Sequence, residues 1–181
     1  VLQASGRAWD GPEIYPDLAW LGRGDGSFEE VSDTLGPQAA DDHYAMATAD
    51  LDQDGCLDLV FVGPGAPPTL LLGRCPDNAW LDLDLAGPPG NAEGLGAWVE
   101  LTANGVRHVR EMQGVRAMGQ EPSTVHVGLG SFEGLSDVVV RWSDGVVFTA
   151  NDLPARARIQ LRHPDTSVPL PSEAWMVADL D

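Results

Sequence analysis

Residues 50–58, DLDQDGCLD, bring four carboxylates into nine consecutive positions. Aspartates stand at positions 1, 3, 5 and 9 of this segment and a glycine at position 6; these residues are Asp50, Asp52, Asp54, Asp58 and Gly55. Calcium takes about six to eight oxygen ligands, and a loop of alternating aspartates supplies them by curling around the ion. The glycine allows the sharp turn that returns the last aspartate to the same centre. We therefore predict a Ca²⁺ site made by the four aspartates and the backbone carbonyl of Cys56.

The negative charges of this loop repel one another unless a cation lies between them. At a separation of about 4 Å and an effective dielectric constant of about 20, each close pair costs about 4 kcal/mol. We expect the loop either to hold a metal ion or to splay open. The alternative interpretation is a solvated acidic turn that binds nothing.

The residues after the loop indicate which kind of calcium motif it is. An EF-hand requires glutamate at position 12 and a helix on each side, but position 12 here is Phe61. Residues 57–63, LDLVFVG, are aliphatic, aromatic and β-branched and stop at a Gly-Pro pair, which is typical of a short buried strand. The loop is therefore expected to join two strands of an all-β protein.

The charge of the chain excludes two classes of partner. The net charge is −18, and all ten basic residues are arginine. Nucleic acids and anionic membrane surfaces both require basic patches. No stretch of about 18 apolar residues occurs, so we predict no membrane insertion. Because the sequence begins at Val1 and shows no signal peptide, we expect it to be a mature or excised piece of a longer protein.

The two cysteines, Cys56 and Cys75, flank a predicted hairpin. If strand 57–63 turns near residues 65–66 and returns over 69–74, the two cysteines lie opposite each other. A disulfide between them would close a loop of about 20 residues and contribute about 3 kcal/mol. It would also indicate an oxidising compartment, extracellular or periplasmic. Two separate buried thiols are the alternative.

The first half of the chain reads as a series of short strands around this loop. Apolar runs at residues 18–21, 28–31 and 44–49 precede it, and two more follow it at 57–63 and 69–74. The stretches GDGSF and ATADLDQDGCLDLVFVG resemble blades of FG-GAP/VCBS β-propellers, whose repeats bind calcium between two strands of a blade. The resemblance implies Asp50, Asp52, Asp54 and Asp58 as the ligands.

The number of such repeats is too small for a closed propeller. Propellers have about four to eight blades, whereas residues 1–76 hold about one and a half. We therefore expect this segment to be the end of a larger propeller. Another chain could supply the missing blades, or this segment could pack against the C-terminal domain instead.

Residues 77–163 predict a second β domain. Alternating apolar runs occur at 80–85, 98–102, 106–112, 124–130, 137–142, 146–149 and 157–162, and Asn104-Gly105 marks a hairpin. Strands at this spacing indicate a small sandwich or barrel. The stretches NAEGLGAWVELTANG, VREMQG, VHVGLG and VVVRWSDGVVFTANDLPA resemble the ASPIC/UnbV domain, which follows FG-GAP/VCBS propellers in the cartilage acidic protein family. Residues 164–181 form a Pro-rich tail that no pattern places.

Other candidate sites carry weaker signals. Asp82 and Asp84 share one face of a strand, and Asn91 and Glu93 share a loop, so either pair could add a second metal site; a solvated face is the preferred interpretation for the two aspartates. The four histidines show no metal-ligand spacing, and no nucleophile elbow, P-loop or dinucleotide fingerprint occurs. We therefore predict no catalytic residues and a protein that is not an enzyme.

These features predict a calcium-binding, non-catalytic extracellular binding or adhesion module in which calcium acts structurally. The resemblance implies such a role, with a protein or carbohydrate partner met through loops and exposed aromatics such as Trp9, Trp98 or Trp175. The alternative is a structural subunit or cleavage product that completes a β-propeller with another chain.

Overall fold

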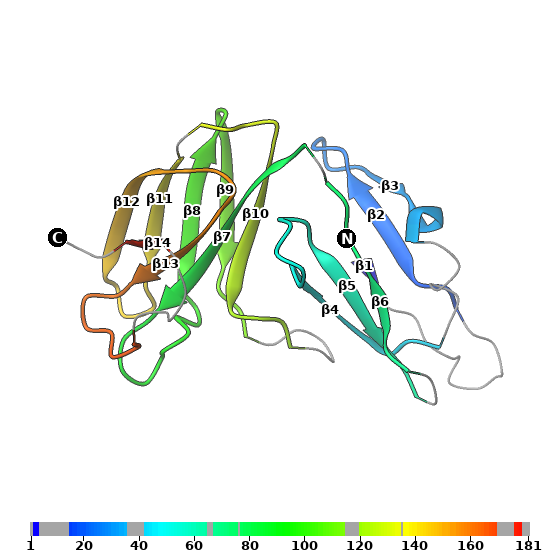
Figure 1. Cartoon of the computed structure of the whole chain (residues 1–181), viewed down its shortest axis with the longest axis horizontal. Coiled ribbons are helices and arrows are strands. Elements are labelled where there is room, and N and C mark those ends of the chain that lie inside the picture. Colours follow the sequence, from blue (N-terminus) through cyan, green and yellow to red (C-terminus); the bar gives the residue numbers. More distant parts are fainter. Residues whose placement is uncertain are drawn as a thin grey trace. The chain divides into compact units, whose positions relative to one another are not determined.

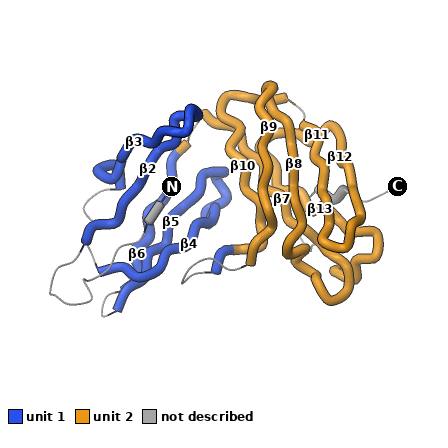
Figure 2. Tube along the Cα trace, turned by 180° about the vertical axis from the view of Figure 1, so that it is seen from behind, with its two compact units in different colours: residues 1–74, 115–121 blue, residues 75–114, 122–181 orange. Residues whose placement is uncertain are grey.

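Two compact units make up the chain. The computed structural model describes residues 2–3, 15–35, 42–64, 67–75, 77–114, 120–134, 136–169 and 176–178, the first and last of these as backbone only. Unit 1 comprises residues 1–74 and 115–121, and unit 2 comprises residues 75–114 and 122–181 (Figure 2). Trp9 and Trp175 lie outside the described residues. None of the described helices is long and apolar enough to cross a membrane.

Unit 1 contains two sheets of three strands each, ordered β1-β2-β3 and β4-β5-β6 (Figure 1). All of these pairs are antiparallel. The elements are β1 Leu2–Gln3, β2 Leu18–Gly22, β3 Phe28–Glu30, the short 3-10 helix η1 Ser32–Leu35, β4 Ala45–Ala49, β5 Asp58–Val62 and β6 Thr69–Leu71. The predicted strands of this half are therefore present, as expected for partial propeller blades.

Polar contacts connect the parts of unit 1. The carboxylate of Asp17, just before β2, lies 2.6 Å from Nδ1 of His43, just before β4, and both side chains are buried. The His43 ring stacks on Phe61 of β5 with 5.0 Å between ring centroids. Glu121 accepts hydrogen bonds from the hydroxyl and the amide of Thr48 on β4, at 2.6 and 3.3 Å. A buried ionisable pair therefore ties the first sheet of the unit to the second.

Unit 2 is a sandwich of two four-stranded sheets, ordered β10-β7-β13-β14 and β12-β11-β8-β9. Its strands are β7 Ala79–Ala86, β8 Trp98–Ala103, β9 Val106–Glu111, β10 Thr124–Gly130, β11 Ser136–Arg141, β12 Val147–Leu153, β13 Ala157–Arg162 and β14 Met176–Ala178. The pairs β7-β13 and β13-β14 are parallel, and the others are antiparallel. The prediction of an all-β chain with a β-sandwich domain is confirmed, and residues 176–178 of the tail add an edge strand that no sequence pattern indicated.

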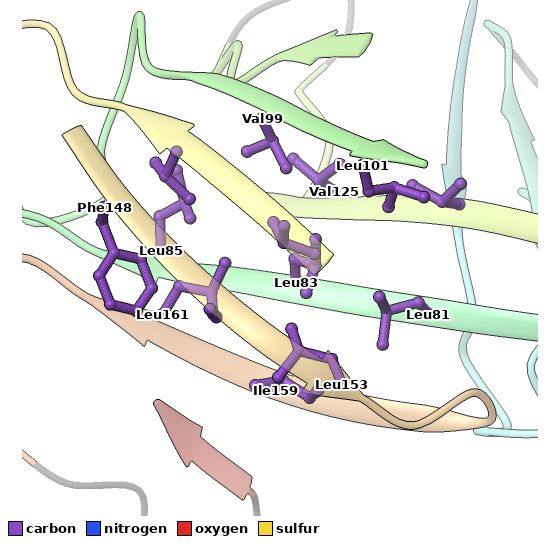
Figure 3. Close-up of a cluster of buried hydrophobic side chains, with 14 of the residues drawn as sticks. Leu81, Leu83, Leu85, Val99, Leu101, Val125, Phe148, Leu153, Ile159 and Leu161 are labelled. Carbon is purple, nitrogen blue, oxygen red and sulfur yellow. The ribbon is translucent and has the colours of Figure 1, made fainter. Parts of the chain in front are cut away.

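The core of unit 2 follows from strict alternation along its strands. Leu81, Leu83 and Leu85 of β7 point to the inside, and Val99 and Leu101 of β8 face them from the other sheet (Figure 3). Successive side chains of a strand point to opposite faces, so β7, β8, β10 and β11 each contribute alternate residues to this core. All twenty residues of the buried apolar cluster belong to unit 2. This unit therefore has a hydrophobic core of its own.

The disulfide is present. Both cysteines of the chain are disulfide-bonded, so Cys56 is joined to Cys75, as predicted. The register of β5 and β6 pairs Leu59 with Leu71. Continued outward, this register would set Cys56 opposite residue 74, one position from the expected partner. The bond therefore forms where the chain has already left β6.

Gly94 has a backbone conformation and surroundings that only glycine tolerates. Its φ is +65°, and a Cβ atom there would lie 2.9 Å from Cβ of Leu85 and 2.9 Å from Cζ3 of Trp142. Gly90 has a φ of +87° but open space around it. We expect Gly90→Ala to lower the free energy of unfolding by about 1 kcal/mol, from backbone strain alone, and Gly94→Ala by a further ~1–3 kcal/mol from overpacking. Urea unfolding of both variants tests this, and equal losses would contradict it.

The disulfide between Cys56 and Cys75 should stabilise the folded chain by constraining its unfolded state. Replacing both cysteines by alanine should lower the free energy of unfolding by about 2–4 kcal/mol, since the roughly 20-residue loop is no longer closed in the unfolded chain. Thermal melts of this double variant and of the oxidised chain, both without reductant, measure the effect. Adding reductant to the double variant should change nothing, and a further loss there would point to a different cause.

Candidate functional site

Three aspartates of the loop between β4 and β5 converge on one point. Oxygen atoms of Asp50, Asp52 and Asp58 all lie within 4.8 Å of one another. Asp50 is half-buried, Asp52 is exposed and Asp58 is fully buried. The antiparallel pair Ala49 and Asp58 closes the base of the loop, because β4 ends where β5 begins. The loop therefore joins two strands, as the sequence predicts; Asp50 and Asp52 lie in the loop and Asp58 begins β5.

The Asp58 carboxylate holds the loop to its neighbours. One of its oxygens accepts a hydrogen bond from the amide of Leu51 at 2.8 Å, and the other accepts one from the amide of Gly73, also at 2.8 Å. A Cβ atom on residue 73 would lie 2.4 Å from the carbonyl oxygen of Leu57, so the close approach requires glycine. Backbone amides that donate to a buried carboxylate stabilise its charged form.

The backbone of the loop turns through two residues with positive φ. Gln53 has a φ of +62° and Gly55 a φ of +89°. The amides of Asp54 and Gly55 donate to the carboxylate of Asp50, at 3.1 and 2.9 Å. These hydrogen bonds wrap the backbone around the carboxylate of Asp50. The short loop can therefore bring the carboxylates of Asp50 and Asp58 together.

The remaining predicted ligands occupy different places. Asp54 is exposed and is not among the three clustered carboxylates; one of its oxygens accepts a hydrogen bond from the amide of Cys56 at 2.8 Å. This hydrogen bond spans two residues, as in an Asx turn. The carbonyl oxygen of Cys56 remains a predicted ligand, and its side chain is committed to the disulfide.

The donor set fits calcium better than a transition metal. It consists of carboxylate oxygens alone, and neither a thiolate nor an imidazole belongs to the cluster. Hard cations select such oxygens, and calcium accepts a larger and less regular coordination shell than magnesium. Asp50, Asp52 and Asp58 would hold the ion, with its charge offsetting their mutual repulsion.

The two aspartates of β7 are not a solvated face. Asp82 is buried and lies 2.7 Å from Nδ1 of His126 on β10. Asp84 accepts hydrogen bonds from Arg158 on β13 at 2.7 Å and from the Thr124 hydroxyl at 2.6 Å. The expectation of solvation was wrong because neighbouring strands place a histidine ring beside Asp82, and an arginine and a hydroxyl group beside Asp84. Each is engaged with protein groups, as the interior of a sheet requires.

Asn91 stabilises a turn. Its side chain bonds both the amide and the carbonyl of Leu95, at 2.8 and 2.9 Å. Gly94 and Gly96 in the same turn have φ values of +65° and +77°. Asn91, Gly94 and Gly96 lie in the stretch that resembles the ASPIC/UnbV domain. Their part in this turn explains why these residue types occur there.

The sequence did not predict three histidine–aspartate pairs that the structure contains. His43 pairs with Asp17 and His126 with Asp82, and Nε2 of His163 lies 3.1 Å from a carboxylate oxygen of Asp144. The partners are 19 to 44 residues apart, since the chain must fold before they meet. Within the described residues, no serine, threonine or cysteine side chain bonds to these rings.

Family models match both halves of the chain. One, described as FG-GAP-like repeat, matches residues 11–61 and so includes the aspartate loop. Another, described as ASPIC and UnbV, matches residues 87–168, which include β8 to β13. No curated protein matches the chain. The chain is therefore a member of the proteins that combine an FG-GAP-like repeat with an ASPIC and UnbV domain.

Proposed function

We propose that this chain is a non-catalytic, extracellular or periplasmic binding module whose FG-GAP-like repeat is stabilised by calcium. The observation that carries the proposal is the convergence of Asp50, Asp52 and Asp58 within 4.8 Å. Three carboxylates so close together destabilise the fold unless a cation joins them. In this role calcium acts structurally.

The small core of unit 1 supports a stabilising role for the ion. Among the described residues, the buried hydrophobic side chains of this unit are Ala19, Cys56 and Phe61, whereas unit 2 has a core cluster of twenty. Small cores rarely stabilise a fold unaided, and disulfides or metal ions commonly supplement them. Cys56, in the aspartate loop of unit 1, is disulfide-bonded, and the ion would act beside it.

Three observations are compatible with a location outside the cytoplasm. The disulfide persists in oxidising compartments. The FG-GAP-like repeat and the lack of a membrane-spanning helix among the described residues agree with it. Calcium at extracellular concentrations would also fill sites of modest affinity. The partner in this setting is a protein or a carbohydrate.

A second candidate function is completion of a β-propeller with another chain. Nine of the thirteen large hydrophobic side chains that are exposed among the described residues lie in unit 1; they are Tyr15, Leu21, Phe28, Tyr44, Leu51, Leu57, Val62, Leu70 and Leu72. Exposed apolar surface of this kind is typical of an interaction site. Neighbouring blades would cover it in a complete propeller.

Calcium should raise the melting temperature of the chain, and excess chelator should reverse the rise. At a free concentration of about 100 times Kd, an ion that binds only the folded state adds about 2.7 kcal/mol. Magnesium should give a smaller rise because it demands a near-octahedral shell. Thermal melts by circular dichroism measure this, and identical melts with calcium and with chelator would refute the calcium site.

The variant Asp52→Asn separates binding from folding, because Asp52 is exposed while Asp58 is buried. In chelator it should melt at or above the temperature of the native chain, since one repulsive charge is gone. In calcium it should lose most of the rise. Asp33→Asn removes an exposed acid from η1 and is the matched control. If the control lost the calcium response equally, the effect would arise from net charge.

Sedimentation velocity distinguishes the two candidate functions. We expect the calcium-loaded chain to sediment as a 19.2 kDa monomer. Obligate association would favour propeller completion instead, and Leu70→Asp, which places a charge on an exposed position of β6, should then disperse the oligomer.

A further inference from the structure

The outer face of sheet β12-β11-β8-β9 carries an exposed tryptophan. Trp98, the first residue of β8, is 49% exposed, while the next residue, Val99, is buried in the core. Indole is a large apolar group with one hydrogen-bond donor, and an exposed one on a regular sheet contributes nothing to the core. Packing of the core therefore does not explain why a tryptophan occupies position 98.

Strand register places groups of opposite charge on either side of this indole. Trp98 is paired with Arg141 of β11 on one side and with Glu111 of β9 on the other. Val147 of β12, which is 50% exposed, is paired with Arg141 and completes the row. Directly paired residues lie about 4.5–5.5 Å apart on the same face. The row thus presents a planar apolar ring between a donor and an acceptor.

The polar groups of this row are available to a ligand. Within the described residues, neither the Trp98 indole nitrogen nor the Arg141 guanidinium makes a hydrogen bond or an ion pair. One oxygen of Glu111 accepts a hydrogen bond from Gln113 at 3.1 Å. An exposed donor, Arg141, and an exposed acceptor, Glu111, therefore lie on either side of the indole and do not bond to each other.

The next row keeps a carboxylate ionised on the same face. Glu100 accepts two hydrogen bonds from Arg107, at 2.6 and 2.7 Å. The hydrogen bond from Arg107 lowers the pKa of Glu100, with smaller contributions from the charges of Arg107 and Arg141. Val139 and Val109, paired with Glu100 on either side, are only half-buried. The face therefore continues as a flat mixture of charged and small apolar groups.

The charge of this face indicates the class of ligand. The charged residues that the regular register of β8, β9 and β11 places on this face are Arg107, Arg141, Glu100, Glu111 and Asp137, two positive and three negative, so their sum is −1 in a chain of net charge −18. A strongly charged partner requires a surface of one sign. A ligand that is neutral overall but rich in hydroxyl groups instead requires interspersed donors and acceptors.

We propose that this face binds a neutral glycan, with one pyranose ring stacked on the Trp98 indole. The C–H face of a sugar ring is apolar and matches the indole plane, while its hydroxyl groups accept from Arg141 and donate to Glu111. This inference names the partner of the binding module proposed above and rests on that role. It does not require the aspartate loop, which lies in unit 1.

Isothermal titration with neutral hexasaccharides tests the proposal on the full chain. The probes are hexamers of glucose, mannose, xylose and galactose, with an oligogalacturonate and a heparin hexasaccharide as charged comparisons. We expect binding to at least one neutral probe and weaker binding to the charged ones. Binding to none of the neutral probes, or tighter binding to the charged ones, overturns the proposal.

Variants show whether the face itself is responsible. Trp98→Ala should weaken binding about tenfold or more, as for a central aromatic contact, and Trp98→Tyr should restore most of it. Phe28→Ala, at a residue 59% exposed in unit 1, is the matched control and should bind as the native chain does. Unchanged binding by Trp98→Ala, or an equal loss in the control, contradicts the assignment.

The same titrations in calcium and in chelator separate this inference from the proposed role of the ion. If the calcium site fails, melts show no calcium shift while the glycan still binds. If the glycan face fails, the shift persists without binding. Melts of Trp98→Ala should match those of the native chain, because an exposed side chain contributes little to the core.

Discussion

The buried carboxylate of Asp58 is the contact on which the aspartate loop depends. It receives the amides of Leu51 and Gly73, so one side chain joins the loop, the start of β5 and the segment after β6. A buried charge is tolerated only where donors or a cation offset its desolvation. The same side chain that orders the backbone therefore also brings negative charge to the place where Asp50 and Asp52 converge.

The two units illustrate two solutions to the same problem of stability. Unit 2 buries alternate apolar residues of several strands, so that two sheets pack over a continuous core. Among the described residues of unit 1, few apolar side chains are buried, and directed contacts take a larger part: the buried pair of Asp17 and His43, the disulfide-bonded Cys56, and the loop around Asp58. The disulfide depends on the redox state and the aspartate loop on its charges, whereas burial of apolar area depends on neither.

Local patterns predicted most of the fold, and long-range pairings explain what they missed. The alternation of β7 and the Asn104-Gly105 turn, with φ values of +49° and +74°, act between near neighbours in sequence, so they could be recognised without the structure. The parallel pairing of β7 with β13 and the strand β14 depend on which segments meet after folding. The aspartate loop was predictable because its carboxylates are close together in sequence, while the partner of Asp82, His126, lies 44 residues away.

The order of strands in the sheet β10-β7-β13-β14 has a consequence for how the chain acquires its structure. Strand β7 comes first in unit 2, yet its neighbours β10 and β13 begin at residues 124 and 157. A β-strand with both edges unpaired gains little until its partners arrive, and closing such long loops is slow. During synthesis or export, residues 79–86 thus have no partner strand until β10 is made, and their second edge stays unpaired until β13 is made, whereas the loop at residues 50–58 closes through contacts local in sequence.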